Sequence, residues 1–430
     1  MAVGIGGTVG GGIFVLVGVA SGKAGPAALI AFSLAFIAAL CIALPYAELA
    51  CRLPMAGGGY AFVKLVFGRH VGFVMGWTYW GAYVFLSGYV TIGFGGYLHA
   101  ITGFPVRAGA IALVAACTVV NLLGMKASSS TLTMVLTTAI VGLTGFVVWG
   151  MPHVRLSNLA PFVPHGIGGI FGAALVAFLS FGGFDMIAAA GEEIKRPERT
   201  LPLAILLTLV CVLALYLAVT FVALGTVSSA RLGSSVSPLA DAASVFGGTS
   251  ARYLVAFCAL LTTAATANAV LVVISRTVFA MARDRLLPAP LALLRGRTDT
   301  PRRAVLLAGL LTGIMALTGS VSVSSSTGGF LYVLHFLLPL IALMWLRREK
   351  SRPRSAFTTP IPWLLVPVAF AGCVCLLIAS GGTGSVIGTI WIALGAVAYL
   401  ASMGHARQPW RGGRPAAMAA RWAHLHGSDL

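Results

Sequence analysis

Apolar residues along this chain come in long runs, and the polar residues gather in the shorter stretches between these runs. A helix needs about 20 mostly apolar residues to cross a bilayer. Twelve stretches meet that length, and the eighth is long enough to include an end outside the membrane. The stretches lie near 3–21, 26–50, 71–100, 105–124, 129–150, 168–191, 202–226, 239–282, 303–320, 328–346, 361–380 and 384–403. The pattern predicts an all-α polytopic membrane protein with about 12 transmembrane helices.

The composition agrees with this prediction and leaves no room for a separate soluble domain. Hydrophobic residues make up 59% of the 430 residues and charged residues only 9%. Residues 1–405 are expected to form a single transmembrane domain, followed by a basic cytoplasmic tail at 406–430. Seven cysteines are scattered through the apolar stretches, and an odd number argues against a disulfide framework. Only His424 and His426, in the tail, have a metal-like spacing, so we expect neither a metal nor a cofactor.

The net charge of +18 follows the predicted topology. With the amino terminus inside, the cytoplasmic loops and the tail carry 23 of the 28 Lys and Arg residues. This positive-inside bias predicts a multi-pass protein of the cell membrane with both termini in the cytoplasm. Basic loops also favour contact with anionic lipids of the bilayer, so nucleic acid is not an expected partner. The outer loops hold only Lys23, Arg107, Arg155, Arg231 and Arg252.

Two apolar stretches contain glycines where a membrane helix should be continuous. Gly10, Gly11 and Gly12 lie in the first stretch, and Gly182-Gly183 lies in the sixth, shortly before Asp185. Each glycine lowers helix preference by roughly 1 kcal/mol relative to alanine. Non-helical backbone at membrane depth persists only where protein or a water-filled cavity surrounds it. Matching breaks in two halves point to a transporter site between inverted repeats. We expect repeats at about 1–150 and 160–347, with extra helices at about 361–403.

Four motifs, in consistent order between about residues 4 and 345, resemble the amino acid–polyamine–organocation (APC) superfamily of permeases. They read GGTVGGGIFVLVGVASGKAGPAAL, PYAELACRLPMAGGGYAFVKLVFGRHVGFVMGW, FLSFGGFDMIAAAGEEIKRPERTLP and SRTVFAMARDRLLP. The resemblance implies a LeuT-like fold with a 5+5 inverted repeat plus two extra helices. It also implies transport of amino acids or amines by alternating access.

The two breaks suit a zwitterion. Amides at Gly10–Ile13 lie at the positive end of a half-helix and suit a carboxylate, while carbonyls around Thr8 and Phe178–Phe181 suit an ammonium group. By resemblance, Tyr83 faces the site, and Leu179 stands where many relatives place an aromatic gate, a role for which Phe178 and Phe181 are the alternatives. The expected substrate-binding residues are Thr8, Gly10, Gly11, Gly12, Ile13, Tyr83, Phe178, Ser180, Phe181 and Gly182.

Asp185 is the most informative ionisable residue, because a charge at mid-bilayer is costly and usually functional. It is either a protonation switch for coupling or a cap on the half-helix after Gly182-Gly183, and both roles are compatible. Glu48 and Arg52 have the spacing of a helical ion pair and are interpreted mainly as an anchor. Arg283 and Asp284 mark either a solvated boundary or a gate.

The fifth stretch departs from some proton-coupled relatives, which carry a lysine there. This chain has Thr137 and Thr138, which cannot carry that charge. A sodium site built from carbonyls of the first stretch and Thr262, Thr263 or Thr266 therefore stays an alternative.

The function predicted first is secondary active transport of small neutral or apolar amino acids, coupled to protons or working by exchange. A sodium-coupled symporter is the alternative, and a cationic amino acid or polyamine transporter is favoured less. A channel would need a continuous polar pore, which the two breaks argue against. An intramembrane enzyme would need a metal pair or an acid–base pair, and neither is recognisable, so the protein is predicted not to be an enzyme.

Overall fold

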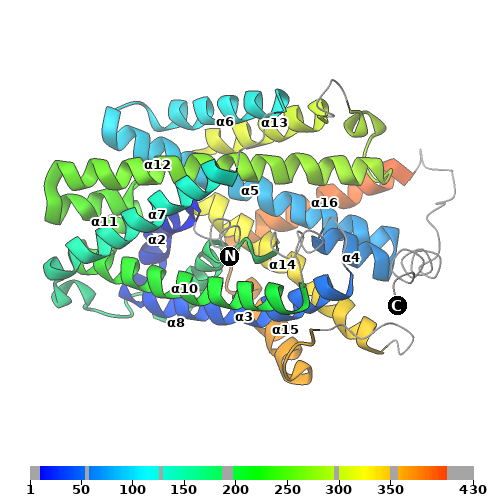
Figure 1. Ribbon diagram of the computed structural model, residues 1–430, viewed down its shortest axis with the longest axis horizontal. Helices are drawn as coiled ribbons and strands as arrows, with labels where there is room; N and C mark the ends of the chain where they lie inside the picture. Colours follow the sequence, from blue (N-terminus) through cyan, green and yellow to red (C-terminus); the bar gives the residue numbers. More distant parts are fainter. Residues whose placement is uncertain are drawn as a thin grey trace.

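The computed structural model describes residues 10–53, 58–124, 129–185, 197–294, 300–348 and 357–403. Throughout these ranges the regular elements are helices, and no β-strand occurs among them. The long helices run side by side along one axis and form an elongated bundle (Figure 1). The all-α fold predicted from the hydropathy pattern is confirmed.

In the part of the chain that the structure describes, each of the twelve predicted stretches contains one long helix, and the sixth stretch is interrupted after that helix. Within the described residues, seven stretches are long and apolar enough to cross a membrane, and shorter apolar helices accompany them. The chain is therefore a polytopic membrane protein. In chain order the twelve helices are α2 (Gly11–Ala24), α3 (Ala28–Arg52), α5 (Arg69–Thr102), α6 (Val106–Leu122), α7 (Ser129–Gly150), α8 (Gly166–Ser180), α10 (Pro197–Thr226), α12 (Pro238–Arg283), α13 (Arg302–Thr318), α14 (Val321–Arg348), α15 (Pro362–Ile378) and α16 (Gly382–Met403).

Several elements lie outside the predicted stretches. The α4 helix (Gly58–Phe67) is too short to cross a membrane and lies where a loop was expected. The α12 helix is long because it consists of two helices joined at Gly248, whose φ of 58° favours glycine. The remaining short helices are α11 (Ser229–Ser234), η1 (Gly25–Ala27), η2 (Met151–His153), η3 (Leu156–Leu159) and η5 (Ala289–Ala292).

The helices pack in pairs that cross the two predicted halves. The α2 helix packs on α8, α3 on α10, α5 along α12, and α6 on α13. In the predicted repeats, each of the first five spans has a counterpart among the next five. Each of these pairs joins a span to its counterpart. The contacts agree with the predicted repeats at 1–150 and 160–347, which remain a prediction. The seven cysteines are all free.

The last helix is fixed to α5 by a reciprocal pair of hydrogen bonds. The Trp77 indole Nε1 donates to the carbonyl oxygen of Trp391 at 2.8 Å, and the Trp391 Nε1 donates to the carbonyl oxygen of Trp77 at 3.2 Å. The indole of Trp391 lies directly over Gly81, where an added Cβ would be 2.1 Å from Nε1. The two helices therefore meet with one specific register.

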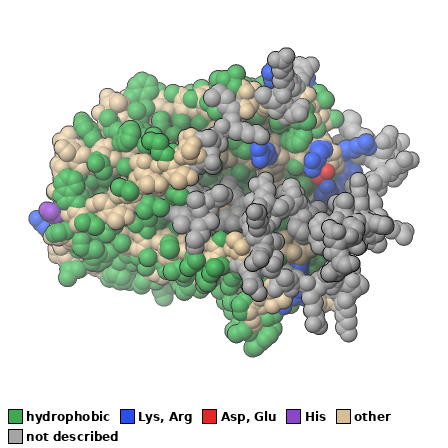
Figure 2. Space-filling view, in the orientation of Figure 1, with side chains coloured by type: hydrophobic (Ala, Val, Ile, Leu, Met, Phe, Trp, Pro, Cys, Tyr) green, Lys and Arg blue, Asp and Glu red, His purple; other side chains and the backbone are tan. Residues whose placement is uncertain are grey.

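The surface of the bundle separates apolar from charged side chains. Figure 2 shows hydrophobic side chains over much of the visible face and Lys and Arg side chains gathered at its right-hand end. The α4 helix lies at this same end (Figure 1). On α16, Ile390, Leu394 and Val397 are exposed, as expected for a surface that faces lipid. The basic end agrees with a positive-inside topology, while the cytoplasmic placement of the termini remains a prediction.

Candidate functional site

The glycines of the first span bring α2 into close contact with α12 and α8. A Cβ on Gly11 would lie 2.8 Å from Thr263 Cγ2 and 3.2 Å from Thr263 Cα. A Cβ on Gly12 would lie 3.2 Å from Ser180 Cα, at the carboxyl end of α8. All of these contacts are buried. The glycines thus permit close packing as well as access to the backbone.

The first turn of α2 presents amides to the centre of the bundle. Gly10, in an extended conformation, precedes the helix, which begins at Gly11. The Gly11 N–H donates to Thr266 Oγ1 at 2.9 Å, and this hydroxyl donates in turn to the carbonyl oxygen of Thr262. Amides in a first turn, here including those of Gly12 and Ile13, have no acceptor within their own helix. The predicted residue Thr8 lies outside the described residues.

The sixth span is broken where the sequence predicted it. The α8 helix ends at Ser180, residues 181–183 form a turn, and helical structure resumes at Phe184. Gly183 has a φ of 109°, a backbone conformation that residues with a side chain rarely adopt. The glycine at this position therefore permits the backbone conformation of the break.

The carbonyls at this break already accept hydrogen bonds. The oxygens of Phe178 and Leu179 accept from the N–H groups of Phe181 and Gly182, both at 3.1 Å. The Ser180 oxygen accepts from the Tyr216 hydroxyl at 3.2 Å. A carbonyl oxygen has two lone pairs, so each retains capacity for one further donor.

Asp185 lies at the centre of a ring of donors and is only 2% exposed. Its Oδ1 accepts from the Tyr332 hydroxyl at 3.0 Å and from the Gly183 N–H at 3.2 Å. Its Oδ2 accepts from the hydroxyls of Tyr83 at 3.2 Å and Tyr79 at 3.3 Å. The contact with Gly183 is the amide contact expected of a capping carboxylate, and the tyrosines add a polar environment that capping alone does not require.

Tyr79 and Tyr332 are the members of this ring that sequence reasoning missed. Tyr79 lies one helical turn before Tyr83 on α5, so the spacing in the motif GWTYWGAYVF could have placed both on one face. Tyr332 comes from α14, and 147 residues separate it from Asp185. No local pattern joins residues so far apart.

The predicted aromatic and gating residues of α8 are fully packed. The ring of Phe178 contacts Tyr332, and that of Phe181 contacts Tyr216 on α10. Leu179 is 4% exposed. The Ser180 hydroxyl is buried without a hydrogen-bond partner in the described part of the chain. The substrate contacts of these residues and the gating role of Leu179 remain predictions.

The threonines of the fifth span lie away from this site. Thr137 and Thr138 line a groove of about 490 Å³ between α7 and α12, together with apolar side chains such as Val141 and Leu254. Their hydroxyls donate to carbonyl oxygens one turn earlier in α7. Among the described residues no cluster of three or more His, Cys, Asp or Glu side chains could hold a metal ion.

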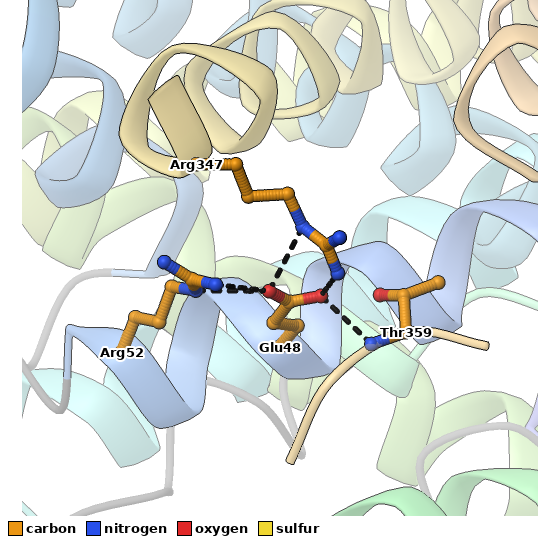
Figure 3. Close-up of polar contacts among 4 residues, drawn as sticks. All are labelled: Glu48, Arg52, Arg347 and Thr359. Atoms are coloured by element: carbon orange, nitrogen blue, oxygen red, sulfur yellow. Dashed lines mark hydrogen bonds and ion pairs between the residues drawn. The ribbon is translucent and has the colours of Figure 1, made fainter. Parts of the chain in front are cut away.

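Glu48 is the centre of a buried ion cluster at the basic end of the molecule (Figure 3). The predicted pair is confirmed, with Arg52 Nε 2.9 Å from Glu48 Oε1. Arg347, at the end of α14, binds both oxygens of the same carboxylate, and the Thr359 N–H donates to Oε2 at 2.8 Å. The cluster therefore joins α3, α14 and the segment that leads into α15, which the helical spacing alone could not predict.

A second polar cluster lies at the same end. The Asp284 carboxylate, just after α12, accepts from the Tyr60 hydroxyl at 2.7 Å and pairs with Lys64. Burial and the hydrogen bond to this carboxylate raise the pKa of Tyr60 well above its usual range. Asp284 thus links α4 to α12. Its contacts are more than those of a purely solvated helix boundary.

Comparison with known proteins extends the likeness over nearly the whole chain. The family described as Amino acid permease matches residues 1–400. The methylthioribose transporter of Bacillus subtilis is 29% identical over 92% of this chain and 90% of its own length. The branched-chain amino acid permease of the same organism is 27% identical over the same shares. The cationic amino acid transporter 4 of Homo sapiens is 31% identical over 82% of this chain and 59% of its own.

Proposed function

The chain belongs to the amino acid permease family of the APC superfamily, and from this premise we propose that it is a secondary active transporter of small neutral or apolar amino acids. The observation that carries the proposal is the meeting of the first turn of α2 with the broken end of α8. Amides at Gly12 and Ile13 suit the substrate carboxylate. The remaining lone pairs on the carbonyls of Phe178 and Leu179 suit its ammonium group.

The hydrogen bonds of Asp185 favour a neutral side chain over a cationic one. Two carboxylate oxygens offer about four lone-pair sites. Gly183 and the hydroxyls of Tyr79, Tyr83 and Tyr332 supply four donors to them. A cationic side chain would have to displace one of these donors. The side chains of Phe178, Leu179 and Phe181 around the break are apolar, which suits an apolar substrate.

For the driving force we propose proton coupling or exchange, with Asp185 as the coupling residue. The sodium alternative receives less support from the threonines of α12. Thr262, Thr263 and Thr266 each donate their hydroxyl to a carbonyl oxygen one turn earlier. The Thr266 oxygen also accepts from the Gly11 amide at the positive end of α2, which is an unfavourable place for a cation.

Alternating access requires one end of the bundle to open while the other closes. The Glu48 and Asp284 clusters join helices of the two proposed repeats at the basic end. We place this end in the cytoplasm of a cell-membrane protein, with both termini on that side. Release of substrate there would require these contacts to separate.

The test is uptake into proteoliposomes containing the purified protein. A panel of labelled alanine, leucine, arginine and methylthioribose is offered with a pH gradient, a sodium gradient or unlabelled substrate inside. The proposal expects saturable uptake of alanine or leucine that a pH gradient or internal substrate stimulates. Stimulation only by sodium would replace the coupling assignment, unsaturable flux would indicate a channel, and a chemically altered substrate would indicate an enzyme.

A further inference from the structure

The α14 helix carries a histidine that the transport site described above does not use. His335 is 1% exposed and lies one turn after Tyr332. Neither ring nitrogen has a hydrogen-bond partner among the described residues. The carbonyl of Tyr332 is near the ring but outside hydrogen-bonding geometry. An ionisable side chain within a membrane span is expensive and is usually functional.

Besides the neighbouring Phe336, the rings packed against His335 belong to two of the tyrosines that bind Asp185. The imidazole centroid is 4.9 Å from the ring of Tyr332 and 5.1 Å from the ring of Tyr79. Both tyrosines donate their hydroxyls to the carboxylate of Asp185. A single layer of tyrosine rings therefore separates the histidine from the aspartate.

We propose that His335 and Asp185 form a two-residue proton site in which Tyr79 and Tyr332 connect the imidazole to the carboxylate. This inference rests on the proposed function, because it assigns a second residue to the coupling site of the same transporter. The ionisable groups that face the pair are Tyr46 from α3, Tyr79 and Tyr83 from α5, and Tyr332 from α14. His335 is the only basic side chain described in this cluster.

The charge balance of the cluster supports one proton per cycle. With Asp185 ionised and His335 neutral, the cluster carries one negative charge, because the tyrosines are neutral. One added proton makes the cluster neutral, whether it resides on the carboxylate or on the imidazole. If it binds Asp185 Oδ2, the hydroxyl of Tyr79 or Tyr83 must release that oxygen. The Tyr79 hydroxyl belongs to the ring that packs against His335, and the unprotonated nitrogen of a neutral imidazole is an acceptor with no donor among the described residues.

The direction of α14 indicates toward which end of the molecule this pair passes the proton. The helix runs from Val321 to Arg348, and Arg347 at its end belongs to the buried cluster with Glu48. His335 is therefore one turn closer than Tyr332 to the basic end of the molecule. A proton taken up at Asp185 beside the substrate can pass to His335 on its way to that end.

The experiment compares His335→Phe and His335→Gln with wild type in proteoliposomes. The probe is labelled leucine or whichever amino acid of the panel wild type transports. Exchange against internal substrate reports binding and alternation, while accumulation driven by a pH gradient reports coupling. One pH unit supports about tenfold accumulation for one proton. His153→Phe is the matched control, because His153 is exposed and its one hydrogen bond among the described residues is to the carbonyl oxygen of Trp149, one turn earlier.

The proposal expects both His335 variants to keep the rate of exchange within about twofold of wild type. It expects them to lose accumulation, so that the ratio of substrate concentration inside to that outside falls to one. The pH dependence of exchange should flatten as well. Full accumulation by His335→Phe would overturn the proposal. Loss of exchange in a variant that remains monodisperse in detergent would overturn it too, because His335 would then be a packing or substrate-binding residue. If wild type transports no amino acid in the panel, the proposed function itself fails, which is a different result.

Discussion

Replacing Glu48 with glutamine tests whether the buried ion cluster holds the basic end together. The carboxylate is fully buried and accepts from Arg52, Arg347 and the Thr359 N–H. Glutamine keeps the volume but turns one acceptor oxygen into an NH₂ group that faces these donors. Removing one partner of a buried ion pair costs about 3–5 kcal/mol. The side chains of Arg347 and Arg52 are 20% and 13% exposed and can recover water, so we expect a loss near 3 kcal/mol.

The measurement is the free energy of unfolding in detergent micelles, followed by tryptophan fluorescence as the denaturant concentration increases. Arg348→Gln is the matched control, because Arg348 is the next residue of α14 and is exposed. A double-mutant cycle with Arg347→Gln isolates the pair, and its coupling energy should be about 1–3 kcal/mol. The reasoning is refuted if Glu48→Gln unfolds within about 0.5 kcal/mol of wild type, the range of an ordinary surface substitution.

Three further predictions concern the site and its frame. Gly11→Val should reduce transport by about tenfold or more, because its Cβ overlaps α12 and overpacking costs about 1–3 kcal/mol. Gly145→Val is the control at an open position and should transport like wild type in the same uptake assay. Asp185→Asn should retain exchange but lose its pH dependence, and an unchanged pH profile would remove Asp185 from coupling. Gly81→Ala should lower the free energy of unfolding by about 1–3 kcal/mol, and Trp391→Leu should relieve that loss by opening the space; no relief would mean that the indole is not the obstacle.

The sequence predicted the helices well because apolar length and glycine breaks are local signals. As far as the structure describes them, the helices of the twelve spans and the break after Ser180 lie where the pattern indicated. The α4 helix was missed because its glycine-rich beginning resembles a loop and its ten residues are too few for a span. The neighbours that pack against Gly11 and Gly12 were not predicted, because a glycine run indicates weak helix preference without naming the residue that occupies the space.

The candidate site was predictable only in part. Asp185 was found because a carboxylate within an apolar span is unusual. The same signal applies to His335 in the tenth span, and it could have been read there. The contacts of Asp185 with Tyr332, and of Glu48 with Arg347, join residues 147 and 299 positions apart. Only the fold brings such residues together, and one sequence contains no periodic pattern that reports it.

The reciprocal bonds between Trp77 and Trp391 have a consequence for the bilayer. The α16 helix presents Ile390 and Leu394 to lipid, while α5 carries two tyrosines that bind Asp185. Sliding α16 along α5 would break both indole bonds at once. A membrane whose hydrocarbon thickness differs from the length of α16 exerts a force on that helix. Because the two indole bonds join α16 to α5, α5 shares the force, and the thickness of the surrounding membrane becomes a variable for the proposed coupling site.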